Sequence, residues 1–254
     1  MFRNLFAQPT YKAYWWPGMG GVRNFGDVLA PLLLTHFAEI NVKWDTISHS
    51  SIASIGSILE HIPPLWDGYI LGSGRLLENS RLHLYNSPAK ILAIRGPLSA
   101  KGLQGSFALG DPGLIANELV GYQKKEWDLG FMPHWQDKEL VPRFQKLVPK
   151  EQSRIVIDSS DEPLTVLKQI ASCKRMVTSS LHGMILSDSF GIPRRVEVCR
   201  AMEKDGGTFK FRDYSASIES KFTPGVMMEP NRFRVEDRQH EIFDAYQELK
   251  KALK

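Results

Sequence analysis

The sequence predicts an α/β protein built from parallel βαβ units in two successive halves. Several segments repeat one order along the chain: a short apolar strand, a small or polar turn, and then a helix. Strands that alternate with helices in this way form parallel sheets, because a parallel pair needs a long and usually helical crossover. At 254 residues, of which 43% are hydrophobic, the chain is long enough for one large domain or two small ones.

The first half contains three informative segments, of which the third shows the full order of strand, turn and helix. In RNFGDVLAPLLLTHF, Asn24 is the expected N-cap of a helix and Asp27 follows three residues later, close to a capping box. In YILGSGRLLE, a strand ends at Leu71 and turns through a Gly-Ser-Gly sequence. In AKILAIRGPLSAKGL, a strand over 91–94 precedes an arginine, and Pro97 stands where the first residue of a helix is expected.

The second half begins after a charged stretch, GYQKKEW, at 121–127. Strand signals resume at WDLGFMPHW, and three later strands are expected, at 155–157, 176–178 and 196–198. The last twenty residues carry apolar side chains at helical spacing and predict an amphipathic helix. The predicted organisation is therefore an N-terminal domain over 1–123, a C-terminal domain over 124–233, and a helix over 234–254 that packs back on the body.

Composition narrows the class of ligand. The formal net charge is +4, and the basic residues are spread along the chain rather than clustered. This balance favours anionic small molecules or an acidic membrane surface, whereas nucleic-acid binding usually shows a basic stripe. No nucleic-acid partner is therefore expected.

The cysteines and the N-terminus indicate in which cellular compartment the protein is expected. Cys173 and Cys199 lack metal-ligand spacing and are expected to be buried free thiols in a reducing compartment. The N-terminus, MFRNLFAQPTYKAY, lacks the apolar core and cleavage site of a signal peptide, and no segment reaches ~18 consecutive apolar residues. We therefore expect a soluble cytoplasmic protein without a structural or catalytic metal cluster.

His182 is the first candidate for chemistry. Thr178 ends a strand, Ser179 or Ser180 can cap the next helix, and His182 then lies in the first helical turn. Free backbone N–H groups and the positive end of the helix dipole attract phosphate or carboxylate there. A bound dianion would favour the charged imidazole, so ligand binding could itself cause His182 to take up a proton. The alternative is a structural histidine bonded to nearby backbone.

Other candidates also follow strands. Arg95 offers a guanidinium that matches a carboxylate or phosphate, and its alternative role is an ion pair across the protein. Asp27 is either a helix cap or a carboxylate in the cleft that accepts a hydroxyl proton. The predicted substrate-binding residues are Gly72, Ser73, Gly74, Asp111, His134, Ser179, Ser180 and Leu181. Turn formation is the ordinary explanation for the glycines and for Asp111.

Seven motifs in order resemble the polysaccharide pyruvyl transferase family, in particular bacterial exopolysaccharide pyruvyltransferases of the succinoglycan type. They are NFGD, GSG, RGPLSAKGL, GDPGLI, GFMPHW, SSLHGMILSDSFGIP and FKFRDYSASI. The similarity extends from about Tyr11 to Ile218. It implies two Rossmann-like domains in a GT-B-like arrangement, with parallel sheets and an interdomain cleft. The N-terminal domain would then be the acceptor side and the C-terminal domain the donor side.

The resemblance also implies a reaction. Phosphoenolpyruvate is the donor substrate, no cofactor is needed, and the product is a cyclic pyruvate ketal on a sugar of an exopolysaccharide repeat unit. The acceptor is a sugar or a lipid-linked oligosaccharide, so the enzyme would work in the cytoplasm or at the cytoplasmic face of the membrane.

The family's donor-binding and catalytic positions fall on Asp27, Arg95, Leu181 and His182. Many members carry arginine immediately before Leu-His-Gly, and Ser180 stands there in this chain. Donor anchoring would then depend more on Arg95, the serines and the helix start. The working hypothesis makes His182 the general acid and Asp27 the base, with Arg95 in the anion cradle.

Two alternatives stay open. The first is a GT-B glycosyltransferase that uses a nucleotide sugar, because one fold serves many reactions. The second is a glycan-binding or anion-binding protein without catalytic activity.

Overall fold

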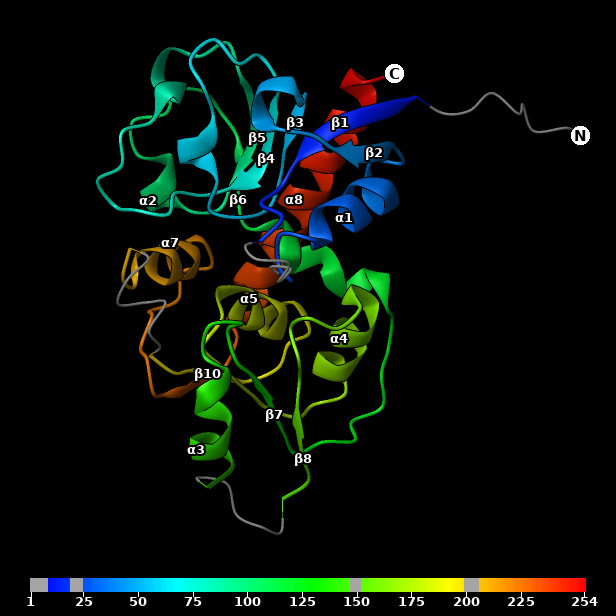
Figure 1. The fold of residues 1–254 in the computed structure, drawn as a ribbon, viewed down its shortest axis with the longest axis vertical. Helices are drawn as coiled ribbons and strands as arrows, with labels where there is room; N and C mark the ends of the chain where they lie inside the picture. Colours follow the sequence, from blue (N-terminus) through cyan, green and yellow to red (C-terminus); the bar gives the residue numbers. More distant parts are fainter. Residues whose placement is uncertain (1–8, 19–24, 147–151, 199–205) are drawn as a thin grey trace, which may run out of the picture.

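The computed structural model describes residues 9–18, 25–146, 152–198 and 206–254, and it confirms the α/β class (Figure 1). Two β-sheets lie one above the other in the view of Figure 1, with helices between them. One hydrophobic core runs through both, because residues from the two sheets and from the helices between them pack in a single cluster.

The first sheet is parallel throughout the described residues, with strand order β2-β1-β3-β4-β5-β6. Its strands are β1 (Thr10–Tyr14), β2 (Asn41–Trp44), β3 (Ile52–Ala53), β4 (Tyr69–Ser73), β5 (Lys90–Ile94) and β6 (Ala108–Leu109). Two α-helices, α1 (Leu29–Phe37) and α2 (Pro97–Ala100), accompany it. The described residues of this part also form the 3₁₀ helices η1 (Ile47–His49), η2 (Leu59–His61), η3 (His83–Asn86) and η4 (Pro112–Leu119).

The second sheet has strand order β11-β10-β9-β7-β8 and is parallel except for its edge pair, β10 and β11. Its strands are β7 (Leu129–Met132), β8 (Arg154–Val156), β9 (Met176–Thr178), β10 (Arg194–Val196) and β11 (Met227–Met228). The described helices among these strands are η5 (Lys138–Leu140), α3 (Val141–Lys146), α4 (Pro163–Ala171) and α5 (Leu181–Ser189).

The two sheets repeat one topology. When each sheet is numbered from its own first strand, both show the order 2-1-3-4-5, and the first sheet adds a sixth strand. The direction of winding reverses between β1 and β3 in one sheet and between β7 and β9 in the other. In doubly wound α/β folds, ligands bind beyond the carboxyl ends of the strands at this reversal point. Each half is therefore expected to contain one ligand-binding crevice, at the reversal point of its sheet.

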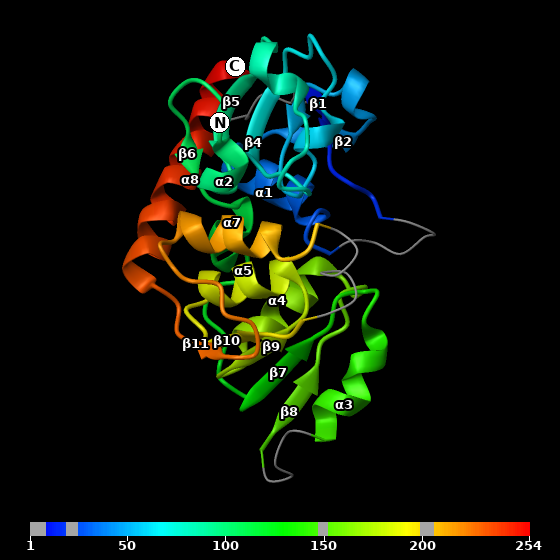
Figure 2. The same ribbon diagram turned by 90° about the vertical axis from the view of Figure 1, so that its left-hand side faces the viewer.

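Two late helices connect the halves. Helix α7 (Phe209–Ser217) lies between α2 above and α5 below, and it contacts both (Figure 2). Helix α8 (Arg232–Ala252) packs on β4, β5 and β6 of the first sheet, although it follows the second sheet in sequence. Its buried side chains include Ile242, Tyr246 and Leu249, as the amphipathic pattern predicts, whereas Phe243 is partly exposed. The domain boundaries at 123/124 and 233/234 stay predictions.

Several local predictions are confirmed. Pro97 is the first residue of α2, and α5 begins directly after Ser180, which puts His182 in its first turn. Others are wrong in detail. Helix α1 begins at Leu29 with Val28 as N-cap, so Asp27 precedes the helix, and Asn24 lies outside the described residues. Strand β10 ends at Val196, where the sequence suggested that a strand begins.

The Gly-Ser-Gly sequence is not a turn. Gly72 and Ser73 belong to β4, and Gly72 takes a positive φ of 83° inside the strand. A Cβ on Gly72 would lie 2.2 Å from Cδ of Pro112, so the glycine is needed for close packing.

Cys173 is a buried free thiol, and burial raises its pKa to about 12. Cys199 lies outside the described residues. Among the helices that the structure describes, none has the length and apolar character needed to cross a lipid bilayer.

A buried ion pair joins the two halves. Nε of Arg95, which follows β5, donates to Oδ2 of Asp213 on α7 at 2.9 Å, and neither side chain is exposed. Asp213 also accepts from the backbone N–H and the hydroxyl of Ser99. Glycines make room on both sides: a Cβ on Gly74 would lie 2.2 Å from Cζ of Arg95, and one on Gly96 would lie 2.1 Å from the carbonyl oxygen of Asp213.

Breaking this pair should destabilise the protein strongly. Replacing Arg95 by alanine leaves the Asp213 carboxylate buried without its cation, which typically costs about 3–5 kcal/mol. The measurement is urea-induced unfolding at neutral pH. Arg212→Ala is the matched control, because Arg212 on the same helix pairs with Glu78 at the surface, and such pairs contribute roughly 0–1 kcal/mol. Equal losses in the two variants would contradict a structural role for the buried pair.

Candidate active site

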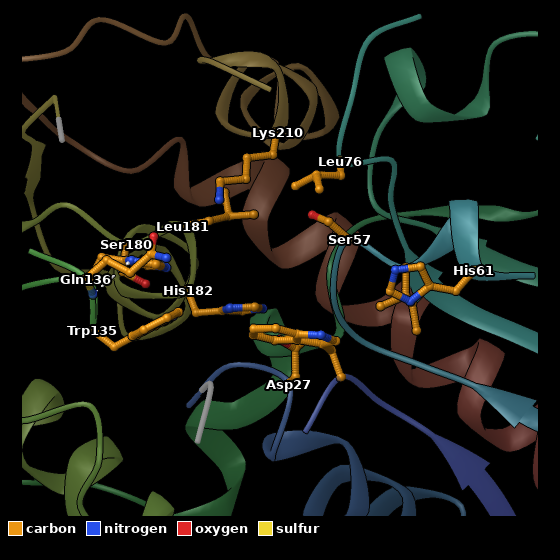
Figure 3. Close-up of a pocket in the computed structure, with 13 residues that line it drawn as sticks. Asp27, Ser57, His61, Leu76, Trp135, Gln136, Ser180, Leu181, His182 and Lys210 are labelled. Carbon is orange, nitrogen blue, oxygen red and sulfur yellow. Dashed lines mark hydrogen bonds between the residues drawn. The ribbon is translucent and has the colours of Figure 1, made fainter. Parts of the chain in front are cut away.

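A cavity of about 260 Å³ lies between the two halves (Figure 3). Both halves contribute to its walls. The described residues that line it are Trp16, Asp27, Ser57, Ile58, His61, Leu76, His134, Trp135, Gln136, Ser180, Leu181, His182 and Lys210.

The cavity forms where the two reversal points face each other. Trp16 follows β1, and the residues from 57 to 61 follow β3. On the opposite wall, the residues from 134 to 136 follow β7, and those from 180 to 182 follow β9. The two crevices predicted by the topology thus open into one site.

The start of α5 forms one end of the cavity. Ser180 is the N-cap residue, but its side chain makes no capping hydrogen bond. Instead, the backbone N–H of Ser180 donates to Oγ1 of Thr178 at 2.9 Å, which fixes the turn between β9 and the helix. A helix start without a side-chain cap presents its first N–H groups and its positive dipole end to a ligand. This is a suitable site for a phosphate or carboxylate group.

His182 lies in the first turn of α5 and is almost completely buried. Burial lowers its pKa to about 3, and the positive charges of Lys210 and Arg95 add to this effect. Its ring packs directly on the backbone of Gly26, where a Cβ would lie 1.6 Å from Nδ1. The imidazole is therefore neutral at pH 7, and its position is fixed by packing.

Lys210 supplies positive charge to the cavity. Figure 3 shows its side chain pointing from α7 into the cavity toward the start of α5. His134 lies on the same wall, and burial, followed by the charge of Lys210, lowers its pKa to about 4. Both histidines of this wall are neutral at pH 7, so among the described lining residues the positive charge comes from Lys210, together with the α5 dipole.

The opposite wall comes from the first half of the chain. Asp27 is almost fully buried there, and a Cβ on Gly56 would lie 1.9 Å from its Oδ1. The hydroxyl of Tyr14 and Nδ1 of His61 form a hydrogen bond of 2.8 Å. Burial lowers the pKa of His61, so its imidazole is predominantly neutral at pH 7. Figure 3 places His61 and His182 on opposite sides of the cavity, with Asp27 between them.

Arg95 does not line the cavity. Its guanidinium is fully buried in the pair with Asp213, and Nη1 donates to Oγ of Ser57 at 2.7 Å. Ser57 lines the cavity, so Arg95 is connected to the cavity wall through this hydrogen bond but does not reach the cavity itself. The geometry therefore favours the alternative role for Arg95, an ion pair across the protein.

Five other predicted binding residues also lie behind the cavity wall. Gly72 and Gly74 pack on Pro112 and Arg95, and the hydroxyl of Ser73 donates to the carbonyl of Ser54. The hydroxyl of Ser179 links two loops, since it accepts from the backbone N–H of His134 and donates to Asp137. Asp111 is fully buried and caps η4 by accepting from Gly113.

Sequence reasoning missed several lining residues, namely Trp16, Ser57, His61 and Lys210. Lys210 stands within FKFRDYSASI, which the sequence offered only as part of a resemblance. The other three follow β1 and β3, which the sequence pattern did not reveal.

No group of three or more His, Cys, Asp or Glu side chains in the described ranges forms a metal site. The expectation that the reaction needs no metal stays a prediction.

Comparison with known proteins gives three similarities. Residues 24–196 match the sequence profile of the polysaccharide pyruvyl transferase family. The chain is 25% identical over 240 residues to the succinoglycan biosynthesis protein ExoV of Rhizobium meliloti (strain 1021), a match that covers 89% of this chain and 69% of ExoV. It is 32% identical over 136 residues to the uncharacterized protein L143 of Acanthamoeba polyphaga mimivirus, covering 49% of this chain and 45% of that protein.

The buried, neutral state of His134 predicts a pH dependence of stability. Its pKa of about 4 lies below the ordinary value of 6.5, so the unfolded chain takes up the proton first as the pH falls. With respect to His134, the free energy of unfolding is therefore highest above about pH 6.5 and decreases as the pH falls toward 4. Between pH 6.5 and about 5, the wild type should lose about 1–2 kcal/mol more stability than His134→Gln, measured by urea unfolding.

His83→Gln is the control, because His83 is exposed and lies outside the cavity lining. It should follow the wild type at each pH. A His134→Gln profile parallel to that of the wild type would show that His134 is not held neutral.

Proposed function

Because the chain belongs to the polysaccharide pyruvyl transferase family, we propose that its cavity binds phosphoenolpyruvate and transfers the pyruvyl group to a sugar. The product is a cyclic ketal on a sugar of an exopolysaccharide repeat unit. The similarity to a succinoglycan biosynthesis protein supports an exopolysaccharide acceptor. The observation that carries the proposal is the cavity itself, where the α5 start, His182 and Lys210 face a wall that contains the Asp27 carboxylate and the neutral imidazole of His61.

The donor site is the C-terminal wall. The first N–H groups of α5 and the ammonium of Lys210 bind the phosphate and the carboxylate of phosphoenolpyruvate. Lys210 thereby supplies the positive charge that an arginine at position 180 supplies in many family members.

The acceptor site is the N-terminal wall. Trp16 offers an aromatic face there, and Trp135 offers another from the opposite wall. Aromatic rings pack against the apolar faces of sugars while polar groups bind the hydroxyls. Asp27 remains the proposed base, and His61 is placed to bind a hydroxyl beside it. A sugar or lipid-linked oligosaccharide fits this role, with the enzyme acting in the cytoplasm or at the cytoplasmic face of the membrane.

The proton balance defines what the residues must do. Ketal formation consumes two hydroxyl protons of the sugar: one ends on C3 of the donor, which becomes a methyl group, and the other leaves with the phosphate. His182 delivers the proton to C3 as general acid, and Asp27 accepts a hydroxyl proton. C2 develops positive charge beside the donor carboxylate, and departure of phosphate is assisted by Lys210 and the α5 dipole.

Loss of Lys210 should weaken donor binding. Removal of a charged partner from an anion typically costs about 1.5–3 kcal/mol, so Lys210→Ala should bind phosphoenolpyruvate roughly 10–100-fold more weakly. Isothermal titration calorimetry measures this directly, with Lys210→Arg expected to retain most of the affinity and the exposed Lys168→Ala as control.

The same titration separates the competing functions. UDP-glucose is the probe for a nucleotide-sugar glycosyltransferase. Binding of UDP-glucose with no heat from phosphoenolpyruvate would contradict the proposal. Binding of phosphoenolpyruvate without turnover on any sugar acceptor would point to a protein without catalytic activity.

Loss of His182 should slow chemistry rather than binding. General acid catalysis contributes roughly 10²–10⁴-fold, so the turnover of His182→Ala should fall by this factor, while the Kd for phosphoenolpyruvate changes only a few-fold. The measurement is phosphate release with a pyruvylation acceptor, and His49→Ala, exposed on η1, is the control. A folded His182→Ala variant with near-normal turnover would refute the general-acid role.

A further inference from the structure

Two buried polar atoms face each other behind the cavity wall. Nε2 of His182 and Oδ2 of Asp111 lie 4.0 Å apart. Neither atom has a hydrogen-bond partner among the residues that the structure describes. Buried polar atoms without partners are rare, because each one has lost its hydrogen bonds to water. The two atoms lie about 1 Å beyond hydrogen-bond distance of each other.

Packing holds both side chains in this orientation. Oδ1 of Asp111 accepts from the backbone N–H of Gly113 at 2.9 Å, which leaves Oδ2 directed at the imidazole. Pro112 packs on Gly72, and the His182 ring packs on Gly26, at distances that no side chain on either glycine would allow. With Nε2 turned to Asp111, Nδ1 is the ring nitrogen left for the reaction.

The burial of the pair favours a single proton between the two side chains. Burial raises the pKa of Asp111 to about 7, against the opposing effects of the Gly113 hydrogen bond and Arg95. The imidazole is neutral, as described above. Below about pH 7 the proton therefore resides on the carboxyl group and not on the ring. In the described part of the chain, the titratable or charged groups around the two residues are Asp27, Arg95, His134, Lys210, Asp213, Tyr214 and Tyr246.

We infer that Asp111 is the positioning residue of His182, and that its Oδ2 and the imidazole Nε2 share the proton that supports transfer to the donor. The inference rests on the proposed function of the cavity. It gives Asp111 a role through His182 in place of the direct substrate contact that the sequence suggested. A shift of about 1 Å brings the two atoms to hydrogen-bond distance, and such contacts commonly tighten when substrate binds.

Protonation of the donor uses one proton from each residue of the pair. The Nδ1–H proton of His182 moves to C3, and the electron pair of the C2=C3 double bond forms the new C–H bond. The Oδ2–H proton of Asp111 moves to Nε2, whose lone pair accepts it. The products are a carboxylate, a neutral imidazole protonated on Nε2, and a cationic C2 that a sugar oxygen attacks. A hydroxyl proton released in the reaction restores the Asp111–His182 pair.

Asp111→Asn tests this role. Asparagine caps a helix as well as aspartate does, so the bond to Gly113 can remain while the transferable proton is lost. Ser189→Ala is the matched control: the Ser189 hydroxyl joins α5 to η4 through Leu114 and Asn117, and it does not contact the Asp111–His182 pair. The control shows how much of any effect comes from weakening the contact between α5 and η4 alone.

The first readout is ¹⁵N NMR of the His182 ring in the absence of substrate, assigned with His182→Ala. In the wild type and in Ser189→Ala, the ring should change from the Nδ1–H to the Nε2–H tautomer with a midpoint near pH 7, as Asp111 ionises. In Asp111→Asn this step should be absent. A tautomer change that persists in Asp111→Asn, or that is missing in the wild type, would overturn the inference.

The second readout is the pH dependence of turnover. The wild-type rate should fall above about pH 7 as Asp111 loses its proton, and Asp111→Asn should lack this limb, with kcat reduced roughly 10–100-fold and KM for phosphoenolpyruvate within about threefold. An unchanged profile in Asp111→Asn, or the same change in Ser189→Ala, would refute the role. If wild-type protein shows no pyruvyl transfer, the proposed function fails, and the NMR step still decides whether Asp111 and His182 share a proton.

Discussion

The Arg95–Asp213 ion pair is the contact on which the geometry of the site depends. It joins the end of β5 to α7 across the boundary between the two halves, and both partners are fully buried. Taking both charges out of water is costly, and only good geometry with further hydrogen bonds compensates for that cost. Ser57, Ser99 and the carbonyl of Arg75 provide those bonds, and Gly74 and Gly96 give the space. The sequence around Arg95 is thus largely explained by one contact.

That contact also places the cation of the site. Lys210 precedes Asp213 by three residues on α7, and side chains three apart lie on neighbouring positions of one helix face. Fixing Asp213 against Arg95 therefore sets the rotation of α7, which turns Lys210 toward the start of α5. On the other side of the pair, Arg95 orients Ser57, a residue of the opposite wall. One buried pair thus aligns groups on both walls of the cavity.

Local signals were enough to predict the α/β class, the helix that starts at Pro97, and the place of His182 at the start of α5. They failed where the fold depends on distant partners. Arg95 reads as an anion-binding residue after a strand, and only Asp213, 118 residues away, makes it structural. The Gly-Ser-Gly sequence reads as a turn, although Pro112 and Arg95 require its glycines. Strand β3 has two residues, too few for a pattern, so His61 could not be placed.

The electrostatic design of the cavity explains why His182 needs a partner. A site that attracts an anion with Lys210 and a helix dipole lowers the basicity of its own histidine, since positive charge and burial both disfavour the imidazolium. A negative ligand offsets the charge of Lys210, but the ring remains buried. A proton held on a nearby buried carboxyl group avoids this conflict, because burial raises the pKa of an acid for the same reason that it lowers that of an imidazole. Burial therefore disfavours the protonated form of His182 and favours the protonated form of Asp111.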